Sequence, residues 1–337
     1  MKFAARITGT GSAFPKKRVT NNCIVKKLSE LGVSTSDEWI WERTGIRERR
    51  ISDAENPDEH NSSLGFSASQ KAMEMAGKSP KSIDQIIYAT CSPDMPLPST
   101  ACRLQHKIGA DQAWAMDINA ACSGFIYGLM IAEKFIQSGQ AKTALVVGGE
   151  VLNPILDWED RNSCILFGDA AGAAVVEQVP SDSSRRIFHS YLCSDGNLKD
   201  LLFVPGGGSN MEITPERYAQ KVNKLKMKGR EIFKVAVKTL TNVSLIALKK
   251  NQMTLDELDW FVPHQANLRI IESVAKHLEF PMEKVLVNID RYGNTSAATI
   301  PTVLDEANRD GRIKSGQTVL LSAFGAGLTC GSVLIRW

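Results

Sequence analysis

Short apolar runs bounded by glycine alternate with longer amphipathic stretches along this chain. A short apolar run is typical of a strand covered on both faces, whereas apolar residues three and four positions apart indicate a helix. The predicted strands are 4–9, 86–89, 113–118, 144–148, 173–177, 260–262, 285–288, 319–322 and 332–335. The predicted helices are 20–31, 64–75, 99–108, 123–137, 231–249, 266–277 and 296–310. Alternating strands and helices predict a layered α/β protein.

The two halves of the chain resemble each other. The stretches 82–88 and 255–261 are each a short acidic turn that leads into a predicted strand. Roughly forty residues later, each half has a small-residue turn that enters a helix, at Cys122 and at Asn294. Two unrelated α/β stretches can also look this similar. We nevertheless predict a duplication into halves 1–178 and 179–337, with Cys122 and Asn294 at equivalent positions near a pseudo-twofold axis.

Cys122 lies between the predicted strand 113–118 and the predicted helix 123–137. Unpaired amide groups and the helix dipole favour a thiolate at the start of a helix, and the thiolate is the form that attacks carbonyl carbons. A buried free cysteine more often serves only as a small apolar side chain. Its role therefore depends on what the rest of the chain brings near it.

The second half of the chain supplies three candidate partners. His264 follows the predicted strand 260–262 and opens a helix, where ligand sites collect in α/β sheets, although it could also be a satisfied buried imidazole. Asn294 stands at the entry of a helix and could be only an N-cap. The glycine-rich turn 323–328 follows an apolar strand and can aim backbone amides at an oxyanion.

Composition narrows the class of protein. With 43% hydrophobic and 23% charged residues, no run of about 18 apolar residues and no signal-like amino terminus, we expect a cytoplasmic protein without a membrane anchor. A net charge of only +3 does not imply nucleic-acid binding. The basic clusters at 43–50 and 221–230 are either solvated surface or a landing patch for a phosphate-bearing or acidic partner. The seven irregularly spaced cysteines predict reduced thiols, with neither a disulfide framework nor a zinc site.

Several rare strings, in one order across nearly the whole chain, resemble those of β-ketoacyl-acyl-carrier-protein synthase III, the initiating condensing enzyme of bacterial fatty acid synthesis. They are ITGTGS at 7–12, TSDEWI at 35–40, RTGIRER at 43–49, AACSGF at 120–125, FGDAAGAA at 167–174, PHQANLR at 263–269 and GNTSAA at 293–298. The resemblance implies the thiolase fold, in which two duplicated halves form a five-layer α-β-α-β-α sandwich.

The resemblance also implies a mechanism. Cys122 would take an acetyl or other short acyl group from coenzyme A, and malonyl-acyl-carrier protein would then lose carbon dioxide and attack the acyl-enzyme. His264 Nε2, neutral or protonated, and the Asn294 amide would stabilise the enolate. The first oxyanion would be held by the amide of Cys122 and by one from the 325–327 turn, which aligns with Ala326 where many relatives have glycine. Phe324 would exclude water, and no metal or tightly bound cofactor is expected.

Substrate contacts follow from the same resemblance. The residues implied in coenzyme A binding are Trp39 and Arg161 around the adenine ring, Thr35 and Arg43 at the nucleotide, and Gly229 and Asn267 along the pantetheine tunnel. Those implied in binding the acidic helix of acyl carrier protein are Lys234, Arg269 and Lys276, with Lys224, Lys226, Lys228 and Arg230 as a possible extension. Relatives are homodimers whose neighbouring subunit closes the acyl pocket. Leu97 takes that place here, where some relatives have phenylalanine, so we expect tolerance of longer or branched primers.

Three other interpretations compete with this one. Cysteine proteases use cysteine, histidine and asparagine in the same chain order, but their local signature is absent around Cys122. A specialised homologue that loads aromatic or unusual acyl groups fits the same motifs. An acyl-coenzyme-A-binding scaffold without catalysis is the non-enzymatic alternative.

Overall fold

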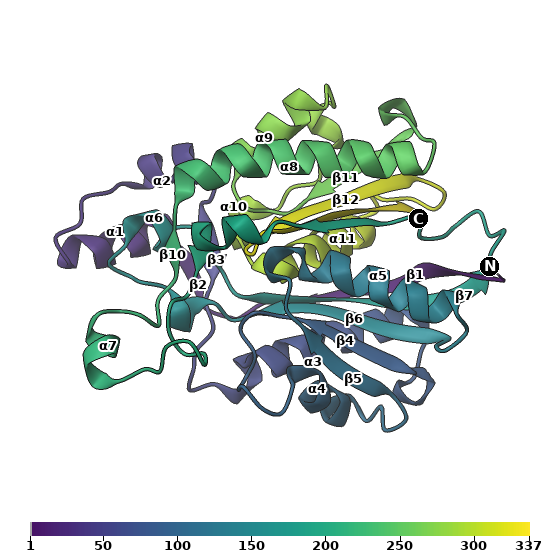
Figure 1. The fold of residues 1–337 in the computed structure, drawn as a ribbon, viewed down its shortest axis with the longest axis horizontal. Coiled ribbons are helices and arrows are strands. Elements are labelled where there is room, and N and C mark those ends of the chain that lie inside the picture. Colours follow the sequence, from purple (N-terminus) through teal and green to yellow (C-terminus); the bar gives the residue numbers. More distant parts are fainter. Residues whose placement is uncertain (1) are drawn as a thin grey trace.

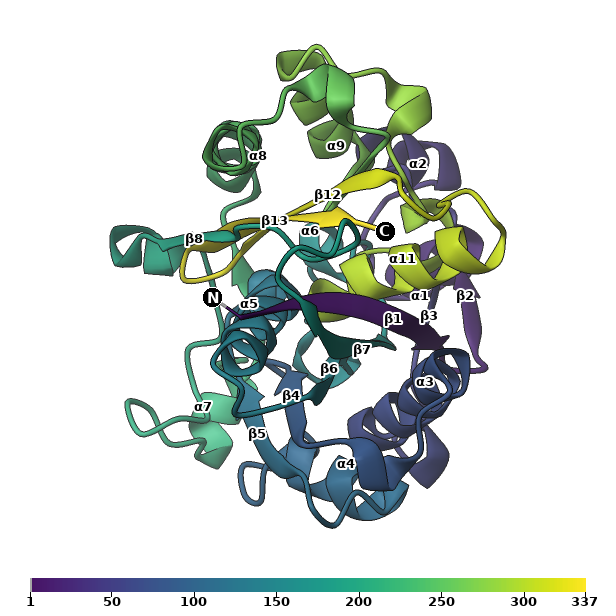
Figure 2. The same cartoon turned by 90° about the vertical axis from the view of Figure 1, so that its right-hand side faces the viewer.

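Two β-sheets face each other in the computed structural model, which describes residues 2–337 (Figures 1 and 2). The first sheet has the order β1-β7-β6-β4-β5 and the second has the order β11-β12-β13-β8. The first comprises β1 (Phe3–Ala13), β7 (Ala170–Pro180), β6 (Thr143–Glu150), β4 (Gln85–Ala89) and β5 (Trp114–Ile118). The second comprises β11 (Trp260–Pro263), β12 (Thr318–Gly325), β13 (Thr329–Arg336) and β8 (Tyr191–Ser194).

The pairing pattern repeats between the two sheets. In the first, β5, β4 and β6 are parallel, while β7 and β1 follow as antiparallel neighbours. In the second, β11 and β12 are parallel, while β13 and β8 follow as antiparallel neighbours. A parallel bridge from Val285 to Phe261 occupies the place of β5. The predicted strand 285–288 is therefore reduced to a single bridge, but the predicted duplication is evident in the topology. The boundary between halves 1–178 and 179–337 stays a prediction.

Helices form the remaining three layers. Between the sheets lie α5 (Gly124–Gln137) and α11 (Thr299–Arg309), which contact strands of both. The outer face of the first sheet is covered by α3 (Asn61–Ala76) and α4 (Thr100–Ile108), and that of the second by α8 (Gly229–Lys250) and α9 (Leu268–His277). Figure 2 shows these layers in cross-section. The predicted five-layer thiolase fold is confirmed.

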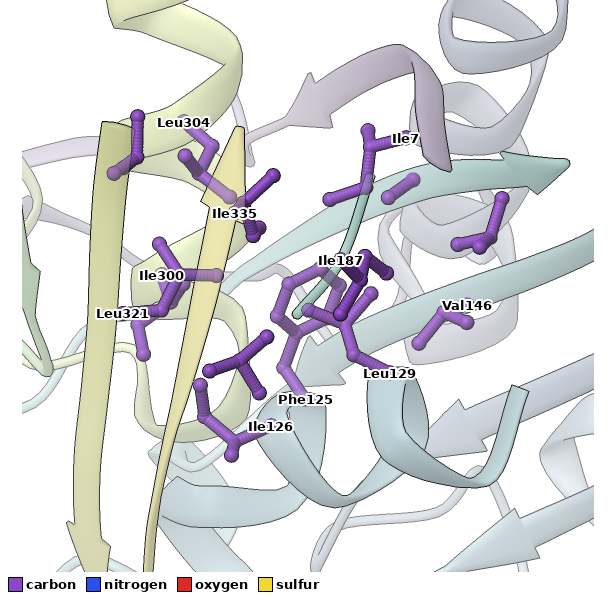
Figure 3. Close-up of a cluster of buried hydrophobic side chains, with 14 of the residues drawn as sticks. Ile7, Phe125, Ile126, Leu129, Val146, Ile187, Ile300, Leu304, Leu321 and Ile335 are labelled. Atoms are coloured by element: carbon purple, nitrogen blue, oxygen red, sulfur yellow. The ribbon is translucent and has the colours of Figure 1, made fainter. Parts of the chain in front are cut away.

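The largest core lies between the sheets, around the two central helices (Figure 3). Successive residues of one strand serve opposite faces, so Val146 packs into this central core while Leu145 and Val147 pack against α3 and α4. Phe125 and Leu129 of α5 meet Ile300 of α11 in the same cluster. Since burying such a side chain contributes about 1.5–3 kcal/mol, the central helices are held firmly where both begin.

The smaller elements lie at the ends of the sandwich. They are β2 (Arg18–Thr20), α1 (Asn21–Glu30), α2 (Asp37–Thr44), β3 (Glu48–Arg50), α6 (Arg161–Cys164), β9 (Leu202–Phe203), α7 (Pro215–Ala219), β10 (Lys226–Met227) and α10 (Ile289–Tyr292). The apolar pattern missed α2, a short helix that starts with its Ser36 side chain accepting from Trp39 N and ends at Gly45 with a φ of 72°. A helix of two turns has little room for a periodic apolar face.

The prediction that every cysteine is reduced is wrong for two of them. Cys193 of β8 and Cys330 of β13 are register partners and form a disulfide, with their Cα atoms 5.2 Å apart. The two residues are 137 positions apart, so only the pairing of β8 with β13 brings them together. The other five cysteines are free thiols: Cys23, Cys91, Cys102, Cys122 and Cys164.

Candidate active site

Cys122 lies in a strained turn at the start of the central helix α5. A short 3-10 turn, Ala121–Ser123, precedes α5, and Ala121 has a φ of 46°. Such a conformation costs a residue with a Cβ on the order of 1–3 kcal/mol. The turn is held by a bond from Ala121 N to Asn119 Oδ1 (3.2 Å) and by one from Ser123 Oγ to Thr329 O (3.1 Å). The turn that carries Cys122 is therefore held by contacts from both halves of the chain.

The second half repeats this turn at the start of α11. Ser296 opens the 3-10 turn Ser296–Ala298, has a φ of 50°, and donates its backbone N–H to Asn294 Oδ1 (2.9 Å). Asn294 is thus the counterpart of Asn119, and Ala297 is the counterpart of Cys122. Asn294 therefore lies three residues before the counterpart of Cys122, and the prediction that the two occupy equivalent positions is wrong. Each half of the chain uses a different position of the same turn.

The resting state of Cys122 also differs from the prediction. Only 7% of the residue is exposed, and burial raises the pKa of the thiol to about 12. The Ser296 hydroxyl and the backbone amide of Cys122 lower the pKa, but burial outweighs them. The expected resting thiolate is therefore wrong: at neutral pH Cys122 carries its proton and needs an acceptor when it attacks.

His264 follows β11 and is almost fully buried, with 1% exposed. Its Nδ1 lies 2.7 Å from Thr299 Oγ1, and that hydroxyl donates its only hydrogen to Ser296 O (2.9 Å). Nδ1 must therefore carry the imidazole hydrogen and donate to Thr299, which leaves Nε2 as an acceptor. Burial lowers the pKa of His264 to about 3, so the free protein holds a neutral imidazole. Nε2 can therefore donate a hydrogen bond only when the imidazole is protonated, so the neutral donor that was also expected is excluded.

Asn294 is placed by its backbone rather than by a helix cap. Its N–H donates to Leu166 O (2.9 Å), and its carbonyl accepts from Gly168 N (3.0 Å). Its side-chain oxygen accepts from Ser296 N, as described above, so the amide NH2 group is left for a substrate. The N-cap alternative is thereby replaced by a turn that orients the amide.

One cavity of about 710 Å³ unites most of the predicted site. Its lining includes the predicted catalytic residues, four predicted coenzyme A contacts and two predicted carrier-protein contacts. These residues are Cys122, His264, Asn294, Phe324, Trp39, Arg43, Gly229, Asn267, Lys234 and Arg269. Such convergence of a nucleophile and polar groups in a large cavity is typical of an active site.

The predicted adenine contacts lie around Trp39 of α2. The guanidinium carbon of Arg161 is 4.5 Å from the centroid of the Trp39 ring, and that of Arg43 is 5.5 Å away. Arg161 also donates to the Ser34 carbonyl. An adenine that stacks between Trp39 and Arg161 must therefore separate them. Thr35 does not line the cavity, and its hydroxyl is buried without a partner among residues 2–337.

Asn267 joins two elements at the cavity wall. It caps the start of α9 by accepting from Arg269 N (2.9 Å), and its amide donates to Arg43 O at the end of α2 (2.9 Å). Lys276 lies two helical turns beyond Arg269 on α9, exposed and away from the cavity lining. Asn267 therefore links Arg43 of α2, a predicted coenzyme A contact, to Arg269 of α9, a predicted carrier-protein contact.

A second cavity of about 520 Å³ adjoins Cys122. The predicted residue Ala326 lines it, together with Ser296, and most of the remaining lining is apolar. The residues that sequence reasoning missed here are Cys91, Leu152, Ile155, Phe167, Leu202, Phe203 and Leu225. They come from five separate segments, so no local motif could have identified them. Leu97, the predicted dimer residue, is 84% exposed on the loop that follows β4.

Neither basic cluster of the sequence is a simple surface patch. Arg49 is fully buried and donates to Asn21 Oδ1 (2.8 Å) and Ile165 O (2.6 Å), and burial lowers its pKa to about 10. Lys221 pairs with Asp157 (3.0 Å), and Lys224 donates to the Pro154 carbonyl (2.7 Å). These bonds fasten the segment that carries α7, seen projecting in Figure 1, to the loop after β6.

Residues 2–337 offer neither a metal site nor a membrane-spanning helix. They contain no group of histidine, cysteine and carboxylate side chains that could hold a metal ion. None of their helices is long and apolar enough to cross a membrane.

Comparisons with known proteins agree on one family. Residues 116–196 match the family described as 3-oxoacyl-[acyl-carrier-protein] synthase III, and residues 248–337 match its C-terminal family. A curated relative of Xanthomonas euvesicatoria pv. vesicatoria, named beta-ketoacyl-[acyl-carrier-protein] synthase III, is 49% identical over 336 residues. The alignment covers 100% of this chain and 99% of that relative.

Solved structures give the same result. The crystal structure of 3-oxoacyl-[acyl-carrier-protein] synthase III from Aquifex aeolicus is 44% identical, with a TM-score of 0.89 over 99% of this chain and 100% of that one. The priming β-ketosynthase from the R1128 polyketide biosynthetic pathway is 34% identical, with a TM-score of 0.89 over 99% and 96% of the two chains. This chain therefore belongs to the β-ketoacyl-acyl-carrier-protein synthase III family.

Proposed function

We propose that this protein condenses a short-chain acyl-coenzyme A, acetyl-coenzyme A first among them, with malonyl-acyl-carrier protein. The products are 3-ketoacyl-acyl-carrier protein, coenzyme A and carbon dioxide, and the reaction initiates fatty acid synthesis. The observation that carries the proposal is the 710 Å³ cavity, since it joins Cys122, His264 and Asn294 to a basic entrance with Arg43 and Arg269.

Acyl transfer to Cys122 is the first half-reaction. Forming a thioester on the enzyme divides one difficult transfer into two easier ones. The amide of Cys122 and an amide of the 325–327 turn are the proposed oxyanion donors. Ala326 can serve as the second because its φ angle is not positive, so its amide is oriented without strain. The turn lies close to Cys122, since a Cβ on Gly325 would be 2.7 Å from Cys122 N.

Decarboxylation and condensation form the second half-reaction. Loss of carbon dioxide places negative charge on the malonyl thioester oxygen, and each well-placed donor contributes about 3 kcal/mol to stabilising it. The NH2 group of Asn294 is one proposed donor. His264 Nε2 is the other once it takes up a proton, which the negative malonyl group beside it favours over the neutral form of the free protein. Phe324, which is 5% exposed and lines the cavity, excludes water from the malonyl carboxylate.

Substrate recognition rests on the entrance of this cavity. Trp39, Arg43, Arg161 and Thr35 are proposed to hold the nucleotide of coenzyme A. The exposed Lys234, Arg269 and Lys276 are proposed to meet the acidic helix of acyl carrier protein. The reaction needs no tightly bound cofactor, because the coenzyme A thioester is itself a substrate.

A homodimer with an acyl pocket completed by the partner subunit is part of the proposal. An exposed leucine on a loop, such as Leu97, is a reasonable contact for a second copy. The mostly apolar 520 Å³ cavity beside Cys122 is much larger than an acetyl group needs. The cavity of a single chain has room for branched, longer or aromatic acyl groups, so a homologue that accepts them is the second candidate. A cytoplasmic location stays a prediction.

Intact-protein mass spectrometry with a panel of acyl-coenzymes A separates these candidates. Addition of an acetyl group to the wild type, but not to Cys122→Ala, would support the proposed nucleophile and primer. Addition of only longer or aromatic groups would favour the specialised homologue. A wild type that takes no acyl group would refute the proposal at its first step.

A further inference from the structure

Glu150, at the end of β6, is a carboxylate that solvent does not reach. Its carboxyl oxygens accept hydrogen bonds from Thr90 Oγ1 (3.1 Å), Cys91 N (3.1 Å), Ser92 Oγ (2.5 Å) and Ser296 Oγ (3.0 Å). No ion pair among residues 2–337 includes it. Burying a carboxylate without a neighbouring cation costs free energy of folding. These hydrogen bonds therefore indicate a role for Glu150 beyond packing.

The neighbouring hydroxyl groups have Glu150 as their hydrogen-bond acceptor, and the accepting sites of Thr90 Oγ1 are already occupied. Ser92 Oγ already accepts from Val151 N (2.9 Å), and Thr90 Oγ1 accepts from Asn61 Nδ2 and Ser92 N (3.0 Å each). The hydrogen of each hydroxyl is therefore directed at Glu150. Donors on every side indicate an ionised carboxylate, held in place as a proton acceptor.

Ser296 connects this carboxylate to the nucleophile. Its hydroxyl donates to Glu150 Oε1, and the residue lines the 520 Å³ cavity together with Cys122. The turn 121–123 that carries Cys122 packs against the turn 296–298, and the Ser296 hydroxyl lowers the pKa of the Cys122 thiol. Because the only hydroxyl hydrogen points to Glu150, the oxygen is free to accept from the thiol.

We propose that Glu150, acting through the hydroxyl of Ser296, takes the proton of Cys122 during acyl transfer. As the sulfur forms its bond to the thioester carbon, the S–H bond breaks and its proton passes to Ser296 Oγ. The hydroxyl proton of Ser296 moves to Glu150 Oε1, which becomes a neutral carboxylic acid. When the bond to coenzyme A breaks, the departing sulfur takes a proton back along the same two bonds. The cycle leaves Glu150 ionised and needs no other reactant.

His264 is the competing acceptor, because its Nε2 is unprotonated in the free protein. Burial lowers the pKa of His264 to about 3, whereas burial raises the pKa of Glu150 above its ordinary value. Burial therefore favours a proton on Glu150 and disfavours one on His264. This assignment rests on the proposed function, since it concerns the acylation step, and it leaves His264 for the decarboxylation step.

Single-turnover acylation by acetyl-coenzyme A tests the relay. The variants are Glu150→Gln, which keeps the shape but not the charge, and Ser296→Ala, which removes the connecting oxygen. Alanine is compatible with the backbone at 296, since Ala121 has nearly the same φ in the matching turn (46° against 50°). Loss of proton transfer predicts acylation about 100-fold slower in both, with a rate that rises more steeply with pH than in the wild type.

Glu133→Gln is the matched control. Glu133 is a buried glutamate of α5 whose pKa is also raised by burial, but it bonds to Gln137 and Ser190. This variant should acylate at the wild-type rate. A second readout is decarboxylation of malonyl-acyl-carrier protein by Cys122→Ala, which should not change when Glu150→Gln is added.

The outcomes separate this inference from the proposed function. Slow acylation with intact decarboxylation supports the relay. Equal loss of both activities means that Glu150 is only structural, and normal acylation in both variants excludes it as the acceptor. Either result overturns the inference alone, whereas a wild type that takes no acyl group overturns the proposed function as well.

Discussion

Replacing Gly325 by alanine should block the acylation step through a direct backbone clash. Gly325 ends β12 opposite Thr329, and a Cβ there would lie 2.7 Å from Cys122 N and 3.1 Å from Ser123 N. These atoms belong to the turn that fixes the nucleophile, so a flexible side chain cannot relieve the overlap. Either Cys122 or the 325–327 turn must move.

The expected magnitude follows from the proposed oxyanion donors. Displacing one donor costs about 2.7–4 kcal/mol of transition-state stabilisation, which corresponds to acylation about 100- to 1,000-fold slower. An overpacking cost of about 1–3 kcal/mol in stability should accompany it, because the turn is tightly packed.

The assay is rapid quenching of acyl-enzyme formation followed by intact-protein mass spectrometry, with thermal unfolding measured alongside. Gly208→Ala is the matched control, since a Cβ there meets no atom within 4 Å and its φ is not positive. Gly208→Ala should keep both the wild-type rate and the wild-type stability. Acylation by a folded Gly325→Ala variant within about threefold of wild type would refute the reasoning, since the proposed donor loss is far larger.

Three further predictions concern substrates and thiols. Trp39→Ala removes the stacking surface and should raise the KM for acetyl-coenzyme A about 5- to 30-fold at nearly constant kcat, consistent with about 1–2 kcal/mol of lost stacking and cation-π energy; an unchanged KM would exclude Trp39 from the nucleotide site. Reversing Arg269 and Lys234 to glutamate should raise the KM for malonyl-acyl-carrier protein and spare hydrolysis of acetyl-coenzyme A, and equal loss of both would contradict a docking role. Thiol titration of the denatured, unreduced protein should find the five free cysteines. Reduction should then release Cys193 and Cys330, whereas full reactivity before reduction would contradict the disulfide.

Much of the fold and the catalytic centre follows from local sequence. The alternation of apolar runs and amphipathic stretches predicts the layers, because each pattern records which faces of an element must be buried. Cys122, His264 and Asn294 stand in short contiguous motifs where the chain enters a predicted helix. Their positions in the local sequence therefore identify them as candidates without any knowledge of the tertiary packing.

Tertiary structure alone decided the chemical state of those residues. The helix N-terminus favours a thiolate at Cys122, yet burial by distant segments outweighs it and keeps the proton on sulfur. The hydrogen bond from His264 to Thr299 fixes the imidazole tautomer, and the bond from Ser296 to Glu150 spans 146 positions of the chain. Desolvation and hydrogen-bond partners depend on which segments pack together, and a local pattern holds no record of that.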